Sequence, residues 1–393
     1  MSLTFKRLLA AGIAAAVAFV APAAVPTASA ATNSNSTTAA KYLSSKVGSV
    51  VGTPSTEITA ALGLAAKGKC TYAGSVHAIV NDLAKQAKTY TAGSPAAAAN
   101  LAIAVKALGL NPKSFGTVNL VKGITAGLPK NGQIGSMPSA FSQSLAIIAL
   151  KRAKAKIPAS IVKNLVAQQD ASGAFGYTFG GTFTADPDTT GLAILALKAA
   201  GGHGKQLSRA AYWAKKTQNA KGYWGTWSPS DSTGLLGSAL KVAGKYPDSV
   251  KKARSWLATQ QLKDGGFPNS LNGTTSDPYA TAEALYLVTG RTMLTASLKL
   301  TSCDYAKAPK PRITGTAKVG QTLTAVTGTW KPQPASFGYR WYRNGKAIKG
   351  ATGATYTVTK ADKGRKLTVK VTSKGTGYKK VTRTSTPTAR VTL

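Results

Sequence analysis

Apolar residues recur at helical spacing from residue 38 to about residue 300. Six segments in this region are apolar on all sides, and each follows a Ser, Thr or Asp beside a proline. A side-chain cap with proline in the first turn is typical of a helix N-terminus. The prolines lie 41 to 49 residues apart, at Pro54, Pro95, Pro138, Pro187, Pro229 and Pro278. The pattern predicts six buried helices that begin at these prolines.

A second kind of helix is predicted before the apolar ones. Residues 161–169, 208–218 and 250–261 each carry one apolar stripe with lysine on the opposite face, as an amphipathic surface helix does. An apolar and an amphipathic helix repeated six times must stack to bury a common core. We therefore expect a mainly α fold, an (α/α)6 toroid over residues 38–303 with inner and outer rings.

The turns between outer and inner helices carry a motif of the form Gln-x3-Gly-x-aromatic. Its three copies pair Gln169 with Phe175, Gln218 with Trp224, and Gln261 with Phe267. This motif resembles the QW motif of the prenyltransferase and terpene-cyclase (squalene cyclase type) α/α toroids. The resemblance implies a structural role, in which the Gln bonds the end of an outer helix and the aromatic ring packs beside it.

The last part of the chain follows a different pattern. After a Pro-rich linker over 304–312, Val, Thr and Tyr alternate with Lys and Gly, and Asn344-Gly345 marks a hairpin. Alternation with period two predicts a small β-sandwich over 313–393. The stretch around Trp341 and Tyr342 resembles bacterial Ig-like modules, which implies a buried Trp341 and an exposed Tyr342.

The first 30 residues read as a targeting segment. Lys6 and Arg7 precede an apolar run that ends in Ala28-Ser29-Ala30, which predicts a signal peptide (1–30) followed by a flexible linker (31–37). An uncleaved membrane anchor is the alternative. We expect a secreted, extracellular protein that is associated with the cell wall.

The expected export of the protein bears on the redox state of its two cysteines. In an oxidising compartment, Cys70 and Cys303 are expected to form one disulfide, with two separate thiols as the alternative. The sequence has only two histidines, His77 and His203. A zinc site needs several such ligands close together, so we expect no metal and no cofactor.

Acidic residues are scarce, with 12 Asp and Glu against 50 Lys and Arg and a net charge of +38. Asp186-Pro-Asp188-Thr-Thr resembles the D-x-D-D-T motif of cyclases, which implies that Asp188 protonates an alkene or epoxide. Thr189 stands where that motif has its last Asp. The alternative is that Asp186 caps a helix and Asp188 has no chemical role, because other repeats carry ordinary residues there.

A second candidate is a pair of carboxylates for sugar cleavage. Glu57 and Glu283 lie in the first and last repeats, which become neighbours if the ring closes. Such chemistry needs two carboxylates about 5–10 Å apart. The alternative is that Glu57 only stabilises a helix N-terminus and that Glu283 pairs with a lysine.

Aromatic side chains precede several inner helices. Trp227, Tyr177, Phe179 and Tyr279 are expected to surround one mouth of the ring, where helix N-termini also favour polar or anionic groups. An aromatic rim suits a small hydrophobic ligand. From the sequence alone, a non-catalytic binding protein is favoured over a cyclase-like or polysaccharide-cleaving enzyme.

Half of the net charge that remains after removal of the signal peptide lies in the C-terminal module. Residues from 306 onward contain 19 Lys and Arg and one acid, Asp362. Such a surface attracts polyanions, and outside the cell these are anionic wall polymers or membrane surfaces, not a specific nucleic acid. We expect the module to attach a monomeric protein to the envelope.

Overall fold

The computed structural model describes residues 34–334, 336–374 and 378–393. The predicted signal peptide lies outside these residues. The chain divides into two compact units, one ending at Leu298 and one spanning Lys299–Leu393. We call the first the ring domain and the second the β module. No helix among the described residues has the length and apolar character needed to cross a membrane.

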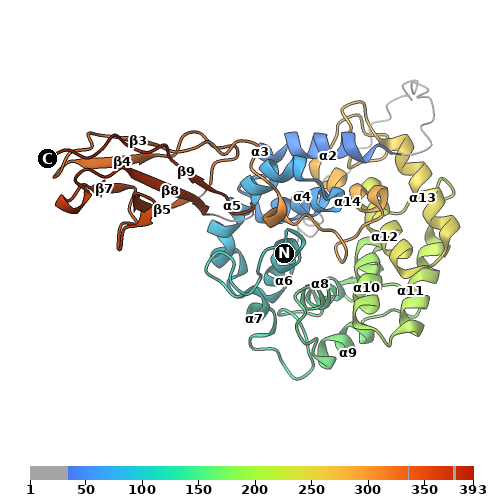
Figure 1. Ribbon diagram of the computed structural model, residues 1–393. Helices are drawn as coiled ribbons and strands as arrows, with labels where there is room; N and C mark the ends of the chain where they lie inside the picture. The colour runs from blue at the N-terminus through green and yellow to red at the C-terminus, as the bar shows by residue number, and fades with distance from the viewer. Residues whose placement is uncertain (1–33, 335, 375–377) are drawn as a thin grey trace. The chain divides into compact units, whose positions relative to one another are not determined.

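The ring domain consists of two concentric layers of helices (Figure 1). The inner helices are α4 (Pro54–Lys67), α6 (Pro95–Ala107), α8 (Ala140–Arg152), α10 (Pro187–Ala200), α12 (Pro229–Ala243) and α14 (Pro278–Thr289). Each inner helix packs against the next, and α14 packs against α4. The ring is therefore closed, and the mainly α toroid predicted from the sequence is confirmed.

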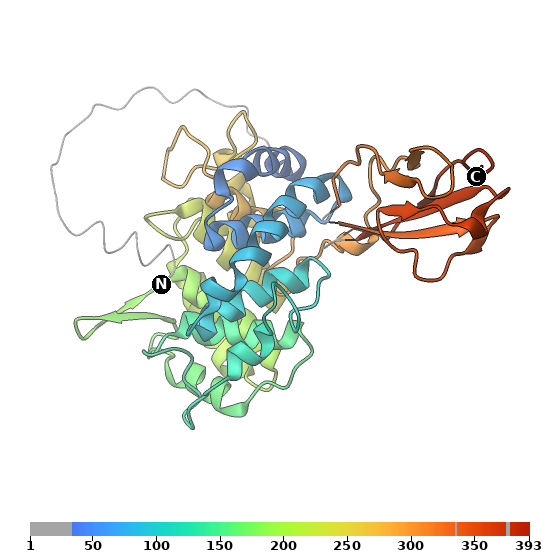
Figure 2. The same ribbon diagram turned by 90° about the vertical axis from the view of Figure 1, so that its left-hand side faces the viewer.

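The outer layer contains more polar helices of uneven length. They are α2 (Ser36–Ser45), α3 (Val47–Val50), α5 (Ala73–Thr91), α7 (Leu120–Thr125), α9 (Ala159–Ala167), α11 (Gly204–Thr217) and α13 (Pro247–Gln260). One short 3-10 helix, Cys70–Tyr72, leads into α5. A two-stranded hairpin, β1 (Gly176–Phe179) and β2 (Thr182–Ala185), lies between α9 and α10 and extends beyond the helices (Figure 2).

Side-chain caps explain where the inner helices begin. Asp186 and Asp277 accept hydrogen bonds from the N–H groups of Thr189 and Ala280, both at 2.8 Å, with a proline at the first helical position. The third repeat differs from the prediction. Its cap is Ser139, and α8 begins one residue later, so Pro138 precedes the cap. A proline before the cap still fixes the chain direction, because its φ angle is restricted.

The three motif glutamines connect neighbouring outer helices. The Gln169 amide donates to the carbonyl of Gln206 in α11, and Gln218 donates to Ser249 in α13, at 2.9 and 2.8 Å. Gln261 donates to the carbonyl of Asn35 at 2.9 Å. Because Asn35 caps α2, this last bond joins the end of the ring to its beginning.

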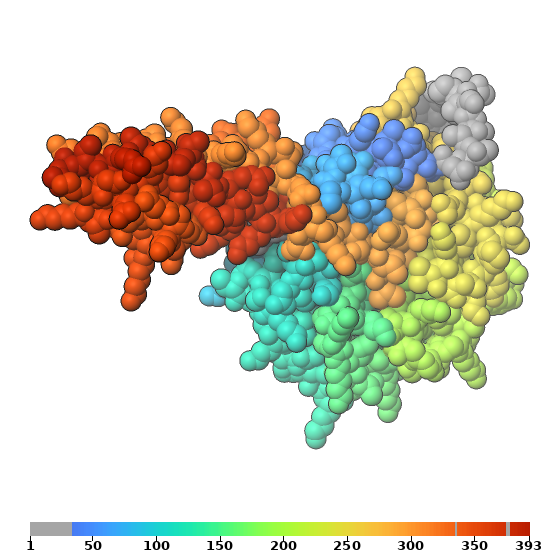
Figure 3. Space-filling model, viewed as in Figure 1, coloured from blue at the N-terminus to red at the C-terminus, as the bar shows by residue number. Residues whose placement is uncertain are grey.

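The final segment of the ring domain crosses the C-terminal ends of the inner helices. Backbone N–H groups of Ser297 and Leu298 donate to carbonyls at the ends of α4 and α6, at 3.0 and 2.8 Å. Arg152, at the end of α8, donates to the carbonyls of Met293 and Ala296, both at 2.7 Å. Figure 3 shows this segment, in orange, between the cyan and yellow parts of that face. The segment covers this end of the ring.

The β module contains two antiparallel sheets. One has the order β3 (Arg312–Thr314), β4 (Thr322–Val326), β7 (Thr355–Thr357), and the other the order β6 (Lys346–Ala347), β5 (Ser336–Arg343), β8 (Leu367–Lys374), β9 (Thr382–Thr384). Two 3-10 turns, Leu300–Ser302 and Lys360–Asp362, complete the unit. Trp341 is fully buried in the core that the sheets share, and Tyr342 is half-buried beneath Lys370.

Both cysteines are disulfide-bonded. Because the sequence contains only two, the bond joins Cys70 to Cys303. The predicted disulfide is confirmed, and the alternative of two separate thiols is wrong.

Candidate functional site

Three first-turn positions of the inner helices are structurally equivalent. The hydroxyl groups of Thr190, Thr233 and Thr281 accept hydrogen bonds from the backbone N–H of the motif aromatics Phe175, Trp224 and Phe267, at 2.8–3.0 Å. Each threonine therefore faces the outer layer. Two residues earlier lie Asp188, Asp231 and Tyr279. Two residues correspond to about 200° around a helix, so these side chains face the interior of the ring.

Glu283 joins this group from the next turn of α14. It lies four residues after Tyr279, on the same face of the helix, and a hydrogen bond links the two side chains. The Tyr279 hydroxyl also bonds to Thr59 of α4. Neighbouring helices α10, α12, α14 and α4 thus contribute side chains to one polar cluster. We call Asp188, Asp231 and Glu283 the inner acids.

The environment of Asp188 favours its protonated form. Burial raises the pKa of this carboxyl well above its usual range, and the charges of Asp186 and Asp231 raise it further. One hydrogen bond from Ser232 acts in the opposite direction. The Oδ1 atom is buried and receives no hydrogen bond from the described residues, although the residue as a whole keeps some exposed surface.

The environment of Glu283 favours its protonated form for the same reasons. Burial comes first, and the nearby carboxylates of Asp231 and Asp188 also raise its pKa well above the usual range. The hydrogen bond from Tyr279 offsets only part of this. Within the described part of the chain, no Lys or Arg contributes to the pKa of Asp188 or Glu283. Like charges repel one another strongly in a poorly solvated space, so the neutral forms of Asp188 and Glu283 are favoured more than those of exposed carboxyl groups.

Asp186 has a mainly structural role. Its Oδ2 atom accepts hydrogen bonds from the N–H and the hydroxyl of Thr189, at 2.8 and 2.5 Å. Burial still raises its pKa, and these bonds lower it. The capping predicted for Asp186 is present, while Asp188, one position beyond the proline, faces the inner acids. The two aspartates of the motif thus lie in different environments.

Glu57 does not lie with the inner acids. It is fully buried on the outer side of α4, where it bonds to Asp82 of α5. Burial first, then the bond and charge of Asp82, raise the pKa of Glu57 to about 7. Thr59 reaches the interior, and Glu57 lies two residues away on the opposite side of the helix. The structure therefore pairs Glu283 with Asp231 and Asp188, and the expected Glu57–Glu283 pair is not formed.

The four aromatic residues predicted to surround the mouth of the ring lie at different depths. Trp227 and Phe179 are 79% and 74% exposed, in the segments that lead into α12 and α10. Tyr177 is half-buried near Asp186. Tyr279 lies deeper, because its hydroxyl contacts Glu283 and its pKa is raised well above the usual range by burial and by that charge. Only Tyr279 of the four is part of the inner cluster.

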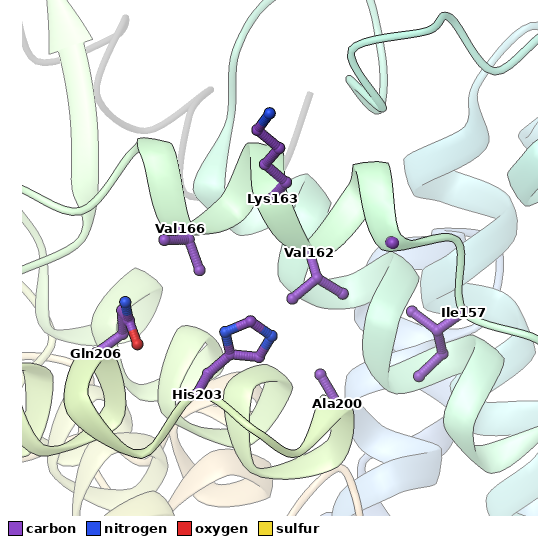
Figure 4. A pocket seen from close by; sticks show the side chains of 8 residues that line it. Ile157, Val162, Lys163, Val166, Ala200, His203 and Gln206 are labelled. Atoms are coloured by element: carbon purple, nitrogen blue, oxygen red, sulfur yellow. The ribbon is translucent and has the colours of Figure 1, made fainter.

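Among the described residues, no group of three or more His, Cys, Asp or Glu is arranged to hold a metal ion. A separate surface groove lies between α9 and α11, where Val162 and Val166 face His203 and Gln206 (Figure 4). This groove contains no carboxyl group. The inner acids are therefore the stronger candidate for chemistry.

Asp231 is the functional residue that sequence reasoning missed. Aligning the repeats on their prolines sets Ser230 against Asp188, and no acid is expected there. The shared Thr-Gly-Leu of residues 190–192 and 233–235 gives a register one residue different, in which Asp231 matches Asp188. The hydrogen bonds of Thr190 and Thr233 show that this second register is the structural one.

Comparison with known proteins finds only distant structural similarity. No protein-family model and no curated protein matches the sequence. Among solved structures, a type II terpene cyclase from Scytonema is 14% identical and an α-1,6-mannanase from Salegentibacter is 13% identical, each with a TM-score of 0.49. The matches cover 65% and 66% of this chain and 96% and 100% of those chains. A protein from Actinoplanes gives similar values, with 12% identity, a TM-score of 0.49, and coverage of 65% and 99%. The chain is thus distantly similar in structure to type II terpene cyclases and to α-1,6-mannanases.

Proposed function

We propose that the ring domain is an enzyme that protonates an apolar substrate held inside the ring. The supporting observation is the group of inner acids, in which burial and neighbouring charges raise the pKa of Asp188 and Glu283 well above the usual range. Perturbed carboxyl groups of this kind are typical of catalytic sites. A purely binding protein would gain nothing from retaining them, since burying several carboxyl groups together is costly.

Asp188 is the proton donor in this proposal. Its Oδ1 atom is buried without a hydrogen bond from the described residues, so it can direct a proton at a substrate carbon or epoxide oxygen. Asp231 and Glu283 keep it protonated, and Tyr279 holds Glu283 in place. The substrate accepts this proton, forms a carbocation, and later loses a proton, so the product is an isomer of the substrate.

Sugar cleavage fits the inner acids less well. That chemistry needs one protonated and one ionised carboxyl facing each other. No Lys or Arg of the described residues contributes to holding Asp188 or Glu283 ionised. Proton donation alone uses the inner acids as they are, and we therefore favour cyclase-like chemistry.

The test is a search for cyclised products. Full-length protein is incubated with linear polyprenyl alkenes, their terminal epoxides and geranylgeranyl dihydroxybenzoate, and isomers are identified by gas chromatography–mass spectrometry. We expect cyclised isomers with wild type and with Asp248→Asn, whose acid is exposed on α13. Asp188→Asn should lower the rate by at least about 100-fold, as loss of a general acid does. Binding without conversion by the wild type would instead make the domain a binding protein.

We also propose that the β module is an Ig-like domain that attaches the secreted protein to anionic wall polymers. Asp362 is the one acid in residues 306–393 and is buried against Arg343, so the charged side chains exposed by the described part of this stretch are positive. Deleting residues 306–393 should release the protein from isolated cell walls in a sedimentation assay. Unchanged retention of the truncated chain would contradict this role.

A further inference from the structure

The side chains that face the ring interior form successive levels, because residues four and seven positions apart lie on one face of a helix. On α8, the Gln143 amide donates to the carbonyl of Ile161 in the outer helix α9 at 3.0 Å, so Gln143 faces outward. Phe141, two residues earlier, therefore faces the interior. The first level on α8, α10, α12 and α14 thus consists of Phe141, Asp188, Asp231 and Tyr279.

The ring interior closes one helical turn below the first level. Phe141, Asp188 and Tyr279 each keep part of their surface exposed. Four positions further along the same helices, the second level consists of Leu145, Leu192, Leu235 and Glu283. None of these four is more than 7% exposed. The interior is therefore accessible at the first level and nearly closed at the second.

The third level is completely filled. Seven positions beyond the first level, it consists of Ile148, Leu195, Ser238 and Tyr286. All four are 0% exposed. A cavity that could hold water beside them would leave part of their surface exposed, so side chains fill the ring at this depth.

Side chains from opposite helices approach each other in the filled part. Helices α8 and α14 lie on opposite sides of the ring, because two inner helices separate them in each direction. Burial raises the pKa of Tyr286 in α14 well above its usual range, the charge of Glu283 raises it further, and the charge of Arg152 in α8 lowers it. Arg152 and Tyr286 therefore lie near each other across the ring.

The open part of the interior is shallow. The four residues from the first level to the second correspond to about 6 Å along a helix axis. Asp188, the proposed proton donor, lies at the entrance of this space, and Leu145, Leu192 and Leu235 lie below it. A single carbon ring fits a space of this depth, whereas a chain folded into several rings needs a longer apolar pocket.

We infer that the ring admits only the terminal end of a linear polyprenyl substrate and closes a single carbon ring, while the rest of the chain stays outside the inner helices. The inference rests on the proposed protonation by Asp188 and adds a limit on the product. Leu145, Leu192 and Leu235 set this limit, because their side chains close the second level.

The reaction steps follow from this limit. The proton of Asp188 moves to the terminal alkene carbon, or to an epoxide oxygen whose bond to the more substituted carbon then breaks. The carbocation takes the electron pair of the next alkene, which forms the new carbon–carbon bond and closes the ring. A carbon next to the new cation loses its proton to water at the open end, and the Asp188 carboxylate takes up a proton there. Alkenes further along the chain lie outside, so the product is a monocyclic isomer.

The test uses acetate esters of two, three and four isoprene units, each with a terminal epoxide. Full-length wild-type protein is incubated with each ester, and products and initial rates are measured by gas chromatography–mass spectrometry. We expect a monocyclic isomer from every ester, with kcat/KM equal within about threefold, because units outside the ring do not leave water. In a deep pocket each further unit would raise kcat/KM by more than about 100-fold, since a buried methylene contributes about fourfold.

A pair of variants tests the role of the second level. Leu235→Ala enlarges the space below Asp231 and should raise the proportion of bicyclic product by about tenfold or more. Leu257→Ala is the matched control, because it removes the same volume from a fully buried leucine of the outer helix α13. It should give the wild-type product, and circular dichroism checks that both variants are folded.

The outcomes separate this inference from the proposed function. Products with several rings from the wild type, or a kcat/KM that rises steeply with chain length, would overturn the single-ring limit and leave protonation by Asp188 intact. Equal bicyclic product from Leu235→Ala and Leu257→Ala would also overturn the limit. Failure of the wild type to convert any of the three esters would overturn the proposed function, and the limit with it. If a variant does not fold, the wild-type series decides alone.

Discussion

The inner acids and Asp362 are buried carboxyl groups with opposite properties. Asp362 is fully buried, yet its pKa is lowered. Burial alone would raise it, but the backbone N–H of Thr359, the Arg343 guanidinium and the Tyr356 hydroxyl all donate to it, at 2.7, 2.5 and 2.8 Å. Asp188 and Glu283 each accept one side-chain hydrogen bond, which lowers the pKa by less than burial raises it. The number of donors, not the depth of burial, decides whether a carboxyl is ionised.

The opposite pKa shifts of Asp362 and of the inner acids Asp188 and Glu283 indicate different roles. In the β module, Asp362 joins the 3-10 turn Lys360–Asp362 to strand β5 through Arg343. The ring domain keeps several acids apart from its many lysines. In a chain so short of acidic residues, four of the twelve, Asp186 and the inner acids, lie together. Shared burial of like charges costs stability and is consistent with a functional use.

The largest expected effect in this comparison is from substituting Asp362. Asp362→Asn leaves the Arg343 guanidinium without its anion and should destabilise the β module by about 3–5 kcal/mol, as breaking a buried pair does. Asp231→Asn is the matched control. It replaces a carboxyl group that lies near two other acids with a neutral amide of similar size and should change the stability of the ring domain by less than about 1 kcal/mol.

Hydrogen exchange with mass spectrometry separates these effects, because peptides from each unit report its own opening. Faster exchange should be confined to 313–393 in Asp362→Asn. If Asp231→Asn opened the ring domain as much, the inner acids would be a structural network, and the comparison would fail.

A smaller effect is expected from pH, with opposite sign in the two units. Glu57 has a pKa raised to about 7, so the folded ring keeps a proton that the unfolded chain loses above about pH 4.3. Ring stability should therefore fall as pH rises from about 4.3 to 7, by at most a few kcal/mol from Glu57, and the raised pKa values of Asp188 and Glu283 act in the same direction. The lowered pKa of Asp362 stabilises the β module above about pH 4, and this contribution is lost as pH falls through the folded-state pKa.

Hydrogen exchange at pH 5 and pH 8, corrected for intrinsic rates, measures this difference. Glu57→Gln should weaken the pH dependence of the ring domain and leave that of the β module unchanged. Greater stability of the ring domain at pH 8 than at pH 5 would contradict the raised pKa of Glu57.

The repeat architecture could be predicted from the sequence because many residues report the same pattern. Caps such as Asp186 and Asp277, apolar helices and motif glutamines all indicate one hairpin per repeat. The inner acids were harder to predict, because direction around a helix changes by 100° per residue. The fifth repeat has one more residue between its proline and its Thr-Gly-Leu than the fourth, so alignment on the prolines did not match Asp231 with Asp188. Glu57 lies two residues before Thr59, which places its side chain on the opposite side of α4.

The segment over 291–298 has a consequence for turnover. It spans the C-terminal ends of α4, α6 and α8 through backbone bonds and Arg152, so under the proposed function a substrate would enter from the end at which the inner helices begin. The substrate and its product would then pass through the same end of the ring, and bound product would delay the binding of the next substrate molecule. An enzyme of this shape should show competitive product inhibition, with release as its slowest event.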